Sequence, residues 1–282
     1  MLDGELLSEA TAKVESVSLG SPRIAIILGS GLGDLAQRLD APVAIPYHQI
    51  PGFVDVSAGG HRGELILGQL EGVPVVAMSG RFHRYEGWSI DQIVFPVRLM
   101  HALGARTLIV SNAAGGVNPA LRVGDLVLIR DHINWLGNPE KTVVQSPPRV
   151  ATWPPASVAE SIRRGAETYD RQLTELAERT ALEHGFDAYD GTYLATLGPN
   201  YETRSEYRMM RRMGVDVVGM STVPEVLTAG ALRMRTLGLS MVSNVANPDR
   251  PVQADHDEVL AAGRAAAVKL EAIVRAVVRH VS

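Results

Sequence analysis

Short apolar runs alternate along the chain with longer segments in which apolar residues recur at helical spacing. The runs are short enough for buried strands, and they occupy 23–28, 64–68, 73–77, 107–110, 126–129, 192–197, 215–218 and 237–242. The second and third runs flank a turn at 69–72, which is typical of a hairpin.

Helical spacing is clearest in four segments: the amino-terminal stretch, 88–103, 170–184 and a final segment that begins near Asp255. Pro96 interrupts the second segment, and Gly104 and Gly185 are the expected ends of the second and third. Strands and helices alternate throughout, and no internal repeat occurs. We therefore expect residues 1–282 to form a single α/β domain, with a mixed central β-sheet flanked by helices on both faces.

Composition narrows the possible functions. The 282 residues are 46% hydrophobic, which suffices for a sizeable core, and the net charge of −4 gives no basic excess for a nucleic-acid polymer or a membrane surface. The chain has no cysteine, which excludes disulfides, a thiolate nucleophile and cysteine-ligated metal sites. It has no signal-peptide pattern and no apolar run of membrane-spanning length, so a soluble cytoplasmic protein is expected.

The segment 75–87 changes from an apolar run to a compact polar cluster. If the run is a strand, the cluster lies beyond its carboxyl end, where ligands bind in open α/β sheets. Arg81 carries a planar fork of donors suited to a phosphate, His83 can donate, accept or carry charge, and Tyr85 offers an apolar face and a hydroxyl to a sugar. The pattern favours a site for an oxyanion and a sugar; a surface loop with solvated charges is the alternative.

A glycine-rich turn follows the first strand at 29–33. Backbone N–H groups in such a turn, and the start of a following helix, can bind a phosphate. No Gly-Lys-Ser/Thr follows, and Asp34 replaces the third glycine of the dinucleotide-binding pattern, so nucleoside triphosphates and dinucleotides are disfavoured. Ser30 is the side chain best placed to contact an anion, although a tight turn that needs glycine for steric reasons explains the pattern nearly as well.

Six predicted strands end in compact clusters of polar or small residues, at 29–31, 79–85, 111–116, 198–202, 219–225 and 243–244. Because these positions are equivalent, we expect one continuous site along the carboxyl edge of the sheet. The residue types sort by chemistry into donors for an oxyanion (Ser30, Arg81, His83, Ser221 and backbone N–H groups near Ala113), contacts for a sugar (Tyr85, Met220, His256) and contacts for a flat heterocycle (Tyr201, Glu202, Asn244).

At these clusters the chain resembles the trimeric purine nucleoside phosphorylases of the nucleoside phosphorylase superfamily, of the 6-oxopurine type. The resemblance covers most of the chain and is strongest at 27–35, 79–87, 111–134, 191–202, 215–225 and 255–260. It implies phosphorolysis in purine salvage: a purine nucleoside and inorganic phosphate, the co-substrate, give the free purine and ribose 1-phosphate. It also implies a homotrimer and no metal or organic cofactor.

The family pattern carries over position by position. Its phosphate-binding positions match Ser30, His61, Arg81, His83, Ala113 and Ser221, its ribose contacts match Tyr85, Met220 and His256, and its purine contacts match Tyr201, Glu202 and Asn244. The resemblance implies catalytic roles for His83, Glu202 and Asn244. His61 and His256 have simpler interpretations as well, as a solvated loop histidine and a residue in the first turn of a helix.

Glu202 and Asn244 predict the base preference. A carboxylate accepts from N1–H, which inosine, guanosine and their 2'-deoxy forms carry and adenosine lacks; an unsatisfied buried charged group costs upward of about 1–3 kcal/mol. The related methylthioadenosine phosphorylases carry Asp at the position of Asn244, which disfavours that alternative. A nucleoside hydrolase that uses water would not need Ser30, Arg81 and Ser221. A non-catalytic purine- or phosphate-binding protein is a further alternative.

The segment 135–168 departs from the family pattern. The family usually has a phenylalanine here that covers the ribose of the neighbouring subunit, whereas this chain has no phenylalanine between Asn138 and Phe186. Two proline pairs, at 147–148 and 154–155, predict an extended, lid-like loop. Trp153 is our candidate for the aromatic cover.

Overall fold

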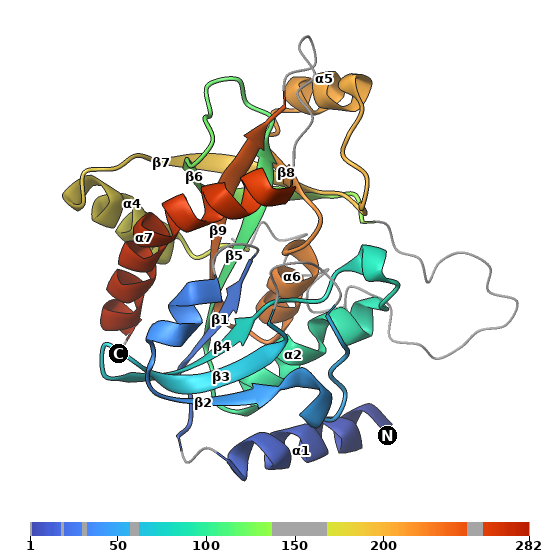
Figure 1. The fold of residues 1–282 in the computed structure, drawn as a ribbon, viewed down its shortest axis with the longest axis vertical. Coiled ribbons are helices and arrows are strands. Elements are labelled where there is room, and N and C mark those ends of the chain that lie inside the picture. The colour runs from blue at the N-terminus through green and yellow to red at the C-terminus, as the bar shows by residue number, and fades with distance from the viewer. Residues whose placement is uncertain are drawn as a thin grey trace, which may run out of the picture.

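The computed structural model describes residues 2–17, 20–29, 33–56, 62–136, 168–246 and 256–281 (Figure 1). Its elements follow one another as α1 (Leu2–Glu15), β1 (Ile24–Leu28), the 3₁₀ helix η1 (Gly33–Arg38), β2 (Asp40–Pro46), η2 (Tyr47–Gln49), β3 (Glu64–Leu70), β4 (Val73–Ser79), η3 (Arg84–Glu86), α2 (Ile90–Ala102), β5 (Thr107–Gly116), β6 (Leu126–Asn134), α4 (Arg171–Glu183), β7 (Ala188–Ala195), α5 (Arg204–Arg212), β8 (Val217–Gly219), α6 (Val223–Ala231), β9 (Arg235–Val245) and α7 (His256–Val281). The four predicted helices and the β3–β4 hairpin are confirmed.

The pattern of apolar residues did not predict three elements, β2, α5 and α6. β2 is mostly exposed and contains Pro42 and Pro46, which weaken a strand signal. α5 is rich in arginine and buries only Met210. α6 has Pro224 in its first turn and is buried on almost every side, so no polar face gives its apolar residues a period.

The strands of the described ranges form one mixed sheet of nine strands in the order β2-β3-β4-β1-β5-β8-β7-β6-β9, and β5 also pairs with β9. The pairs β1–β4, β1–β5 and β5–β9 are parallel, whereas β8 is antiparallel to β5 and β6 is antiparallel to β9. The second pairing of β5 closes β5, β8, β7, β6 and β9 into a ring, in which β6, β7 and β8 run opposite to β5 and β9. The expected α/β fold with a mixed sheet is confirmed, and the ring is an addition that the sequence pattern did not predict.

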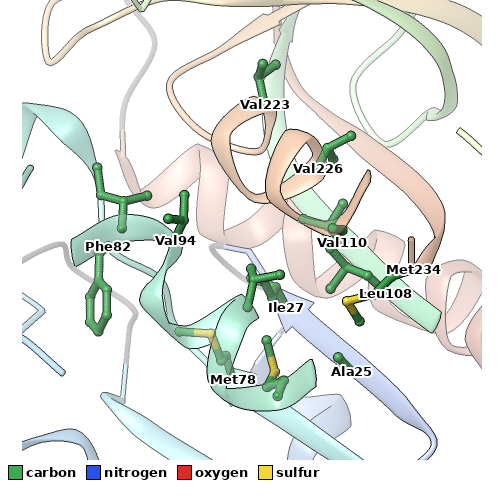
Figure 2. Packing of buried hydrophobic residues seen from close by; sticks show 14 of the residues in the cluster. Ala25, Ile27, Met78, Phe82, Val94, Leu108, Val110, Val223, Val226 and Met234 are labelled. Carbon is green, nitrogen blue, oxygen red and sulfur yellow. The ribbon is translucent and has the colours of Figure 1, made fainter. Parts of the chain in front are cut away.

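Helices cover both faces of the sheet. The side chains of β1 therefore alternate between two hydrophobic cores, one on each face. Ala25 and Ile27 face a cluster to which α1, α2 and α6 contribute (Figure 2). Ile24, Ile26 and Leu28 point the other way, into a cluster with α4 and α7. The buried faces leave the strand ends as the place for a ligand. Within the described ranges, no helix is long and apolar enough to cross a membrane.

Several strands differ in extent from the apolar pattern. The pattern predicts that β5 ends at Val110, which is wrong: 111–116 continue the ladder, from Ser111 opposite Leu239 to Gly116 opposite Val245. β6 likewise continues through 131–134 beside β7, and β7 covers 188–195 instead of 192–197. Small and polar residues extend these strands because ladder hydrogen bonds join backbone groups and need no apolar side chain.

Candidate active site

A cavity of about 420 Å³ lies where the six predicted clusters meet. Each cluster contributes to its wall, from Gly29 after β1 to Asn244 in β9. The predicted site residues whose side chains the structure describes all line this cavity: Arg81, His83, Tyr85, Ala113, Tyr201, Glu202, Met220, Ser221 and Asn244. The chain therefore brings the proposed oxyanion, sugar and base contacts together in one place.

Some of the predicted residues lie outside the described part of the chain. These are Ser30, His61 and Trp153, together with most of the segment 135–168. His256 is the first residue of α7, and its side chain also lies outside the described residues. Their assignments stay predictions.

The predicted clusters do meet, but not because all of their strands end at one edge of the sheet. β7 and β8 run opposite to β5, so their carboxyl ends point back along β5 rather than in its direction. β5 is long, and β8 pairs only with its last residues, Gly115 and Gly116. The ends of β7 and β8 consequently reach the middle of β5, beside Ala113, which is where β1 and β4 also end.

Gly29 lets β1 approach β5 closely at the floor of the cavity. A Cβ atom at this position would lie 2.7 Å from the Cα of Asn112 and 2.9 Å from the carbonyl oxygen of Ser111. The steric reason for a glycine is therefore present here, as the tight-turn interpretation of the glycine loop expects.

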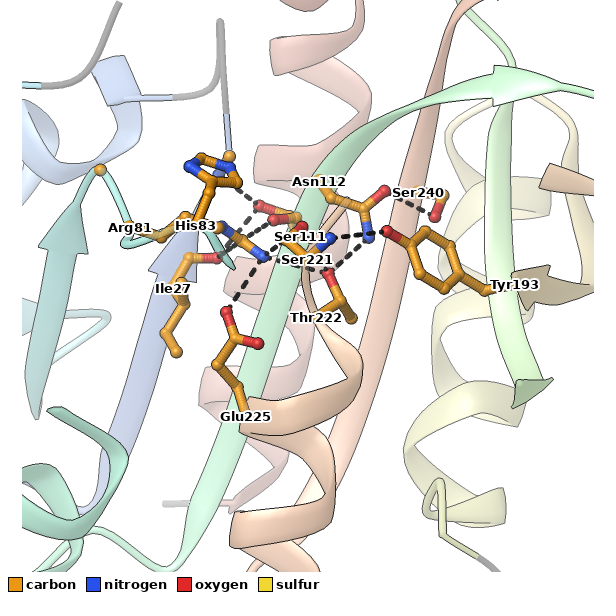
Figure 3. A network of polar contacts seen from close by, with 12 residues as sticks. Ile27, Arg81, His83, Ser111, Asn112, Tyr193, Ser221, Thr222, Glu225 and Ser240 are labelled. Carbon is orange, nitrogen blue, oxygen red and sulfur yellow. Dashed lines mark hydrogen bonds and ion pairs between the residues drawn. The ribbon is translucent and has the colours of Figure 1, made fainter. Parts of the chain in front are cut away.

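Arg81 lies at the centre of a buried polar network (Figure 3). Its Nη1 donates to Ser221 Oγ at 3.1 Å and to Thr222 Oγ1 at 3.0 Å, and it lies 3.5 Å from Glu225 Oε1. Its Nη2 donates to the carbonyl oxygens of Ile27 and Ser111. The guanidinium is thus fixed by β1, β5 and the start of α6 at once, so it lines the cavity with little freedom to move.

Thr222 supports both Arg81 and Asn112. Its Oγ1 accepts from Arg81 and, at 2.9 Å, from Asn112 Nδ2, while Ser240 Oγ donates to Asn112 Oδ1 at 2.8 Å. The backbone of Thr222 has φ 76° and ψ −49°, and the N–H of Val223 bonds to the carbonyl of Ser221 at 2.8 Å. This is a γ-turn centred on a β-branched residue, which is a strained conformation. The turn directs the Ser221 hydroxyl to the cavity and begins α6.

His83 is held by Glu86 in the next turn of the chain. Glu86 Oε1 accepts from the His83 backbone N–H at 2.9 Å and lies 3.0 Å from His83 Nδ1. A carboxylate at Nδ1 assigns a proton to that nitrogen and fixes the orientation of the ring. The ring of Tyr85 stacks on that of His83 with centroids 4.8 Å apart. Burial raises the pKa of Tyr85 to about 12, so its hydroxyl keeps its proton near neutral pH.

Glu202 accepts a hydrogen bond on each carboxylate oxygen. Thr196 Oγ1 lies 3.1 Å from Oε1, and Tyr207 OH lies 3.0 Å from Oε2. Tyr201, which is 51% exposed, lies beside it at the mouth of the cavity. An oriented carboxylate next to an aromatic ring can accept N–H groups from the edge of a flat heterocycle.

Asn244 reaches the cavity because the register of β9 shifts. Ala114 pairs with Val242 and Gly115 with Asn244, so Ser243 is an extra residue on β9. Such bulges re-aim side chains, and here Ser243 Oγ, which lies 3.2 Å from the carbonyl of Ala114, also lies 3.0 Å from Asn244 Oδ1. A bond from the Ser243 hydroxyl to the amide oxygen leaves the amide nitrogen as the donor toward a ligand.

Sequence reasoning missed the residues that support these contacts. Asn112, Thr222 and Glu225 lie in the predicted clusters at 111–116 and 219–225, but the sequence pattern assigned them no role. It also gave no role to Thr196 and Tyr207. Tyr193 is another, since its hydroxyl accepts from the Ser221 backbone N–H at 3.3 Å. The polar side chains at the ends of buried runs were the available signal. Over the described ranges, no group of three His, Asp or Glu side chains is placed to hold a metal ion.

Comparisons of the sequence and of the structure with known proteins agree on one family. The family model described as "Phosphorylase superfamily" matches residues 23–279. Purine nucleoside phosphorylase 1 of Bacillus subtilis is 46% identical over 256 residues, covering 90% of each chain, and the purine nucleoside phosphorylase of Rattus norvegicus is 42% identical over 90% of this chain and 87% of its own. A crystal structure of schistosoma purine nucleoside phosphorylase in complex with hypoxanthine superposes with a TM-score of 0.83 at 37% identity, covering 97% of this chain and 96% of the other.

Proposed function

The chain belongs to the phosphorylase superfamily, and from this membership and the geometry of its cavity we propose that it is a purine nucleoside phosphorylase of the 6-oxopurine type. It converts inosine, guanosine and their 2'-deoxy forms, with phosphate, into the free purine and (deoxy)ribose 1-phosphate. Purine nucleoside phosphorylases at 42–46% identity over most of the chain support the reaction.

One observation carries the assignment of the site. A single cavity is lined both by a fixed cation with a hydroxyl, Arg81 with Ser221, and by a carboxylate with an amide, Glu202 with Asn244. The first pair suits a phosphate, and the second suits the edge of a purine. Tyr85 and Met220 line the same cavity and suit the ribose.

The proposed mechanism uses no covalent bond to the enzyme. Cleavage of the glycosidic bond develops positive charge on the sugar and negative charge on the departing purine. Phosphate, held by Arg81, His83, Ser221 and backbone N–H groups near Ala113, stabilises the first charge and attacks the anomeric carbon. Asn244 donates to the purine near N7 and stabilises the second; a preorganised donor of this kind contributes about 3–4 kcal/mol. Binding phosphate and nucleoside together supplies a further advantage of about 7–11 kcal/mol at most.

The roles of the residues outside the described part are included in the proposal. Ser30 and His61 bind phosphate, His256 binds the ribose, and the segment 135–168 covers the site, with Trp153 as its aromatic cover. We also propose that the protein is a cytoplasmic homotrimer whose reaction needs no cofactor. The resemblance to the trimeric purine nucleoside phosphorylases supports the homotrimer.

The test is purine release from inosine, guanosine and adenosine, each with and without phosphate. Phosphate-dependent release from the first two, with little from adenosine, is the expected result. Release without phosphate would indicate a hydrolase, and release chiefly from adenosine-type substrates would indicate a methylthioadenosine phosphorylase. Purine binding without turnover would assign the chain to the non-catalytic alternative.

A further inference from the structure

Glu202 is held from two different elements. Thr196 follows the last residue of β7, and Tyr207 lies in α5, whose start is fixed by a reciprocal pair of hydrogen bonds between Thr203 and Glu206. The two hydroxyls contact different oxygens of the carboxylate, Oε1 and Oε2. Tyr207 also lines the cavity itself, beside Glu202 and Tyr201.

Both hydroxyls act as donors to Glu202. Burial, and after it the negative charge of Glu202, raise the pKa of Tyr207 well above its ordinary value, so the phenol keeps its proton. The Thr196 hydroxyl has a choice between Glu202 Oε1 at 3.1 Å and the carbonyl of Gly219 at 3.4 Å. The shorter bond to a carboxylate is preferred, and the Gly219 carbonyl already accepts from the Thr196 backbone N–H at 2.8 Å.

We propose that Thr196 and Tyr207 are positioning residues that fix the orientation of the Glu202 carboxylate and thereby determine which purines the base pocket accepts. Two donors on different oxygens prevent rotation of the carboxylate about its terminal bond. A carboxylate can only accept hydrogen bonds. It therefore binds a base that presents N–H at position 1 and opposes a base that presents a lone pair there.

Without these hydroxyls the carboxylate would be free to rotate about its terminal bond. Its hydrogen bond to the N1–H of a 6-oxopurine would weaken, whereas a 6-aminopurine has no such bond to lose. The two hydroxyls thus act on discrimination through Glu202, without contacting the reacting bond. This inference rests on the proposed function, because it assigns the base specificity of the same site.

The experiment compares Thr196→Val, Tyr207→Phe and the double variant with two controls. Thr196→Ser keeps the hydroxyl, and Tyr189→Phe removes a hydroxyl from a partly exposed tyrosine of β7. The ratio of kcat/KM for inosine to that for adenosine is measured, together with the Kd of hypoxanthine and of adenine by calorimetry. We expect the ratio to fall about tenfold in each hydroxyl-deleting variant, since a hydrogen bond to a charged group is lost. Thr196→Ser and Tyr189→Phe should retain the wild-type ratio, and the KM for phosphate should stay unchanged in all variants.

An unchanged inosine-to-adenosine ratio in both Thr196→Val and Tyr207→Phe would overturn the inference. Equal losses for both substrates, with a lowered melting temperature, would also overturn it, because they indicate a structural role only. If the wild-type protein released no purine at all, the proposed function would fail by itself. The calorimetric ratio of hypoxanthine to adenine affinity would then still decide the role of the two hydroxyls.

Discussion

The guanidinium of Arg81 and the carboxylate of Glu225 form a buried ion pair, with Nη1 and Oε1 3.5 Å apart and both side chains no more than 3% exposed. The pair joins the loop after β4 to the first turn of α6. Because the charge of Arg81 is compensated inside the protein, the guanidinium is already in place before any anion arrives. Preorganisation of this kind lowers the cost of ordering on binding.

Glu225→Gln should destabilise the protein strongly. The amide keeps the shape of the side chain but leaves the buried guanidinium without its counter-charge, and loss of one partner of such a pair costs about 3–5 kcal/mol. The free energy of unfolding in urea measures this. Glu175→Gln is the matched control, because it removes the same charge from an exposed pair with Arg171 and should change stability by less than about 1 kcal/mol. Equal effects of the two substitutions would contradict the role of the buried pair.

Thr222 should tolerate serine but not valine. Valine has the shape of threonine but cannot accept from Arg81 and Asn112. Arg81 Nη1 keeps its contacts with Ser221 and Glu225, whereas Asn112 Nδ2 loses its acceptor, and a buried donor without its acceptor costs about 1–3 kcal/mol. Serine keeps the acceptor and removes the β-branch from a backbone with φ 76°. Urea unfolding and the KM for phosphate should therefore separate the two variants. A Thr222→Val protein with wild-type values for both would show that the hydroxyl has no positioning role.

Glu86→Gln should lower kcat/KM by weakening the proposed contact of His83 with phosphate. The amide provides a weaker partner for His83 Nδ1 than the carboxylate does, so the ring loses part of its orientation. We expect kcat/KM to fall about tenfold or more, as for the loss of a charge-assisted hydrogen bond. The effect should appear in the KM for phosphate and in kcat, whereas the binding of free hypoxanthine should change little. A loss confined to hypoxanthine binding would place His83 elsewhere in the mechanism.

Asn244→Asp should move the base preference toward 6-aminopurines. An aspartate can accept from the 6-amino group of adenosine, whereas it meets the 6-oxygen of inosine with a second acceptor. The ratio of kcat/KM for adenosine to that for inosine is therefore expected to rise. No change in this ratio would count against the placement of Asn244 at the purine.

Asp170 should make the stability of the protein depend on pH in the acid range. Burial acts to raise the pKa of Asp170, but hydrogen bonds from Arg235, at 2.6 Å and 3.0 Å, and from the Leu173 N–H outweigh it and hold the pKa below its ordinary value. Because the pKa is lower in the folded state, the stabilisation is present above the unfolded pKa, about 3.9, and is lost as pH falls through the folded value. Asp170→Asn should thus be less stable than wild type at pH 7, with the difference shrinking below about pH 4. A difference in urea unfolding that stays constant down to pH 2 would exclude this titration as its cause.

The sequence by itself determined the class of fold and most of the residues around the cavity. Apolar runs with their period identified the β3–β4 hairpin, α2, α4 and α7, because those elements each bury one face or lie wholly inside. Polar clusters at the ends of the runs identified Arg81, Glu202 and Asn244, because ligands in such sheets bind at strand ends.

Only the tertiary structure decided how these residues are supported. The pairing of β5 with both β8 and β9 closes the ring and reverses β7 and β8, and it depends on backbone hydrogen bonds that small residues make as well as apolar ones. The partners of the site residues follow from this arrangement. Glu225 meets Arg81 from a position 144 residues away, and the bulge at Ser243 orients Asn244. Such contacts depend on the register of the strands and on which distant elements pack together. The local hydrophobic period of the sequence contains no information about either.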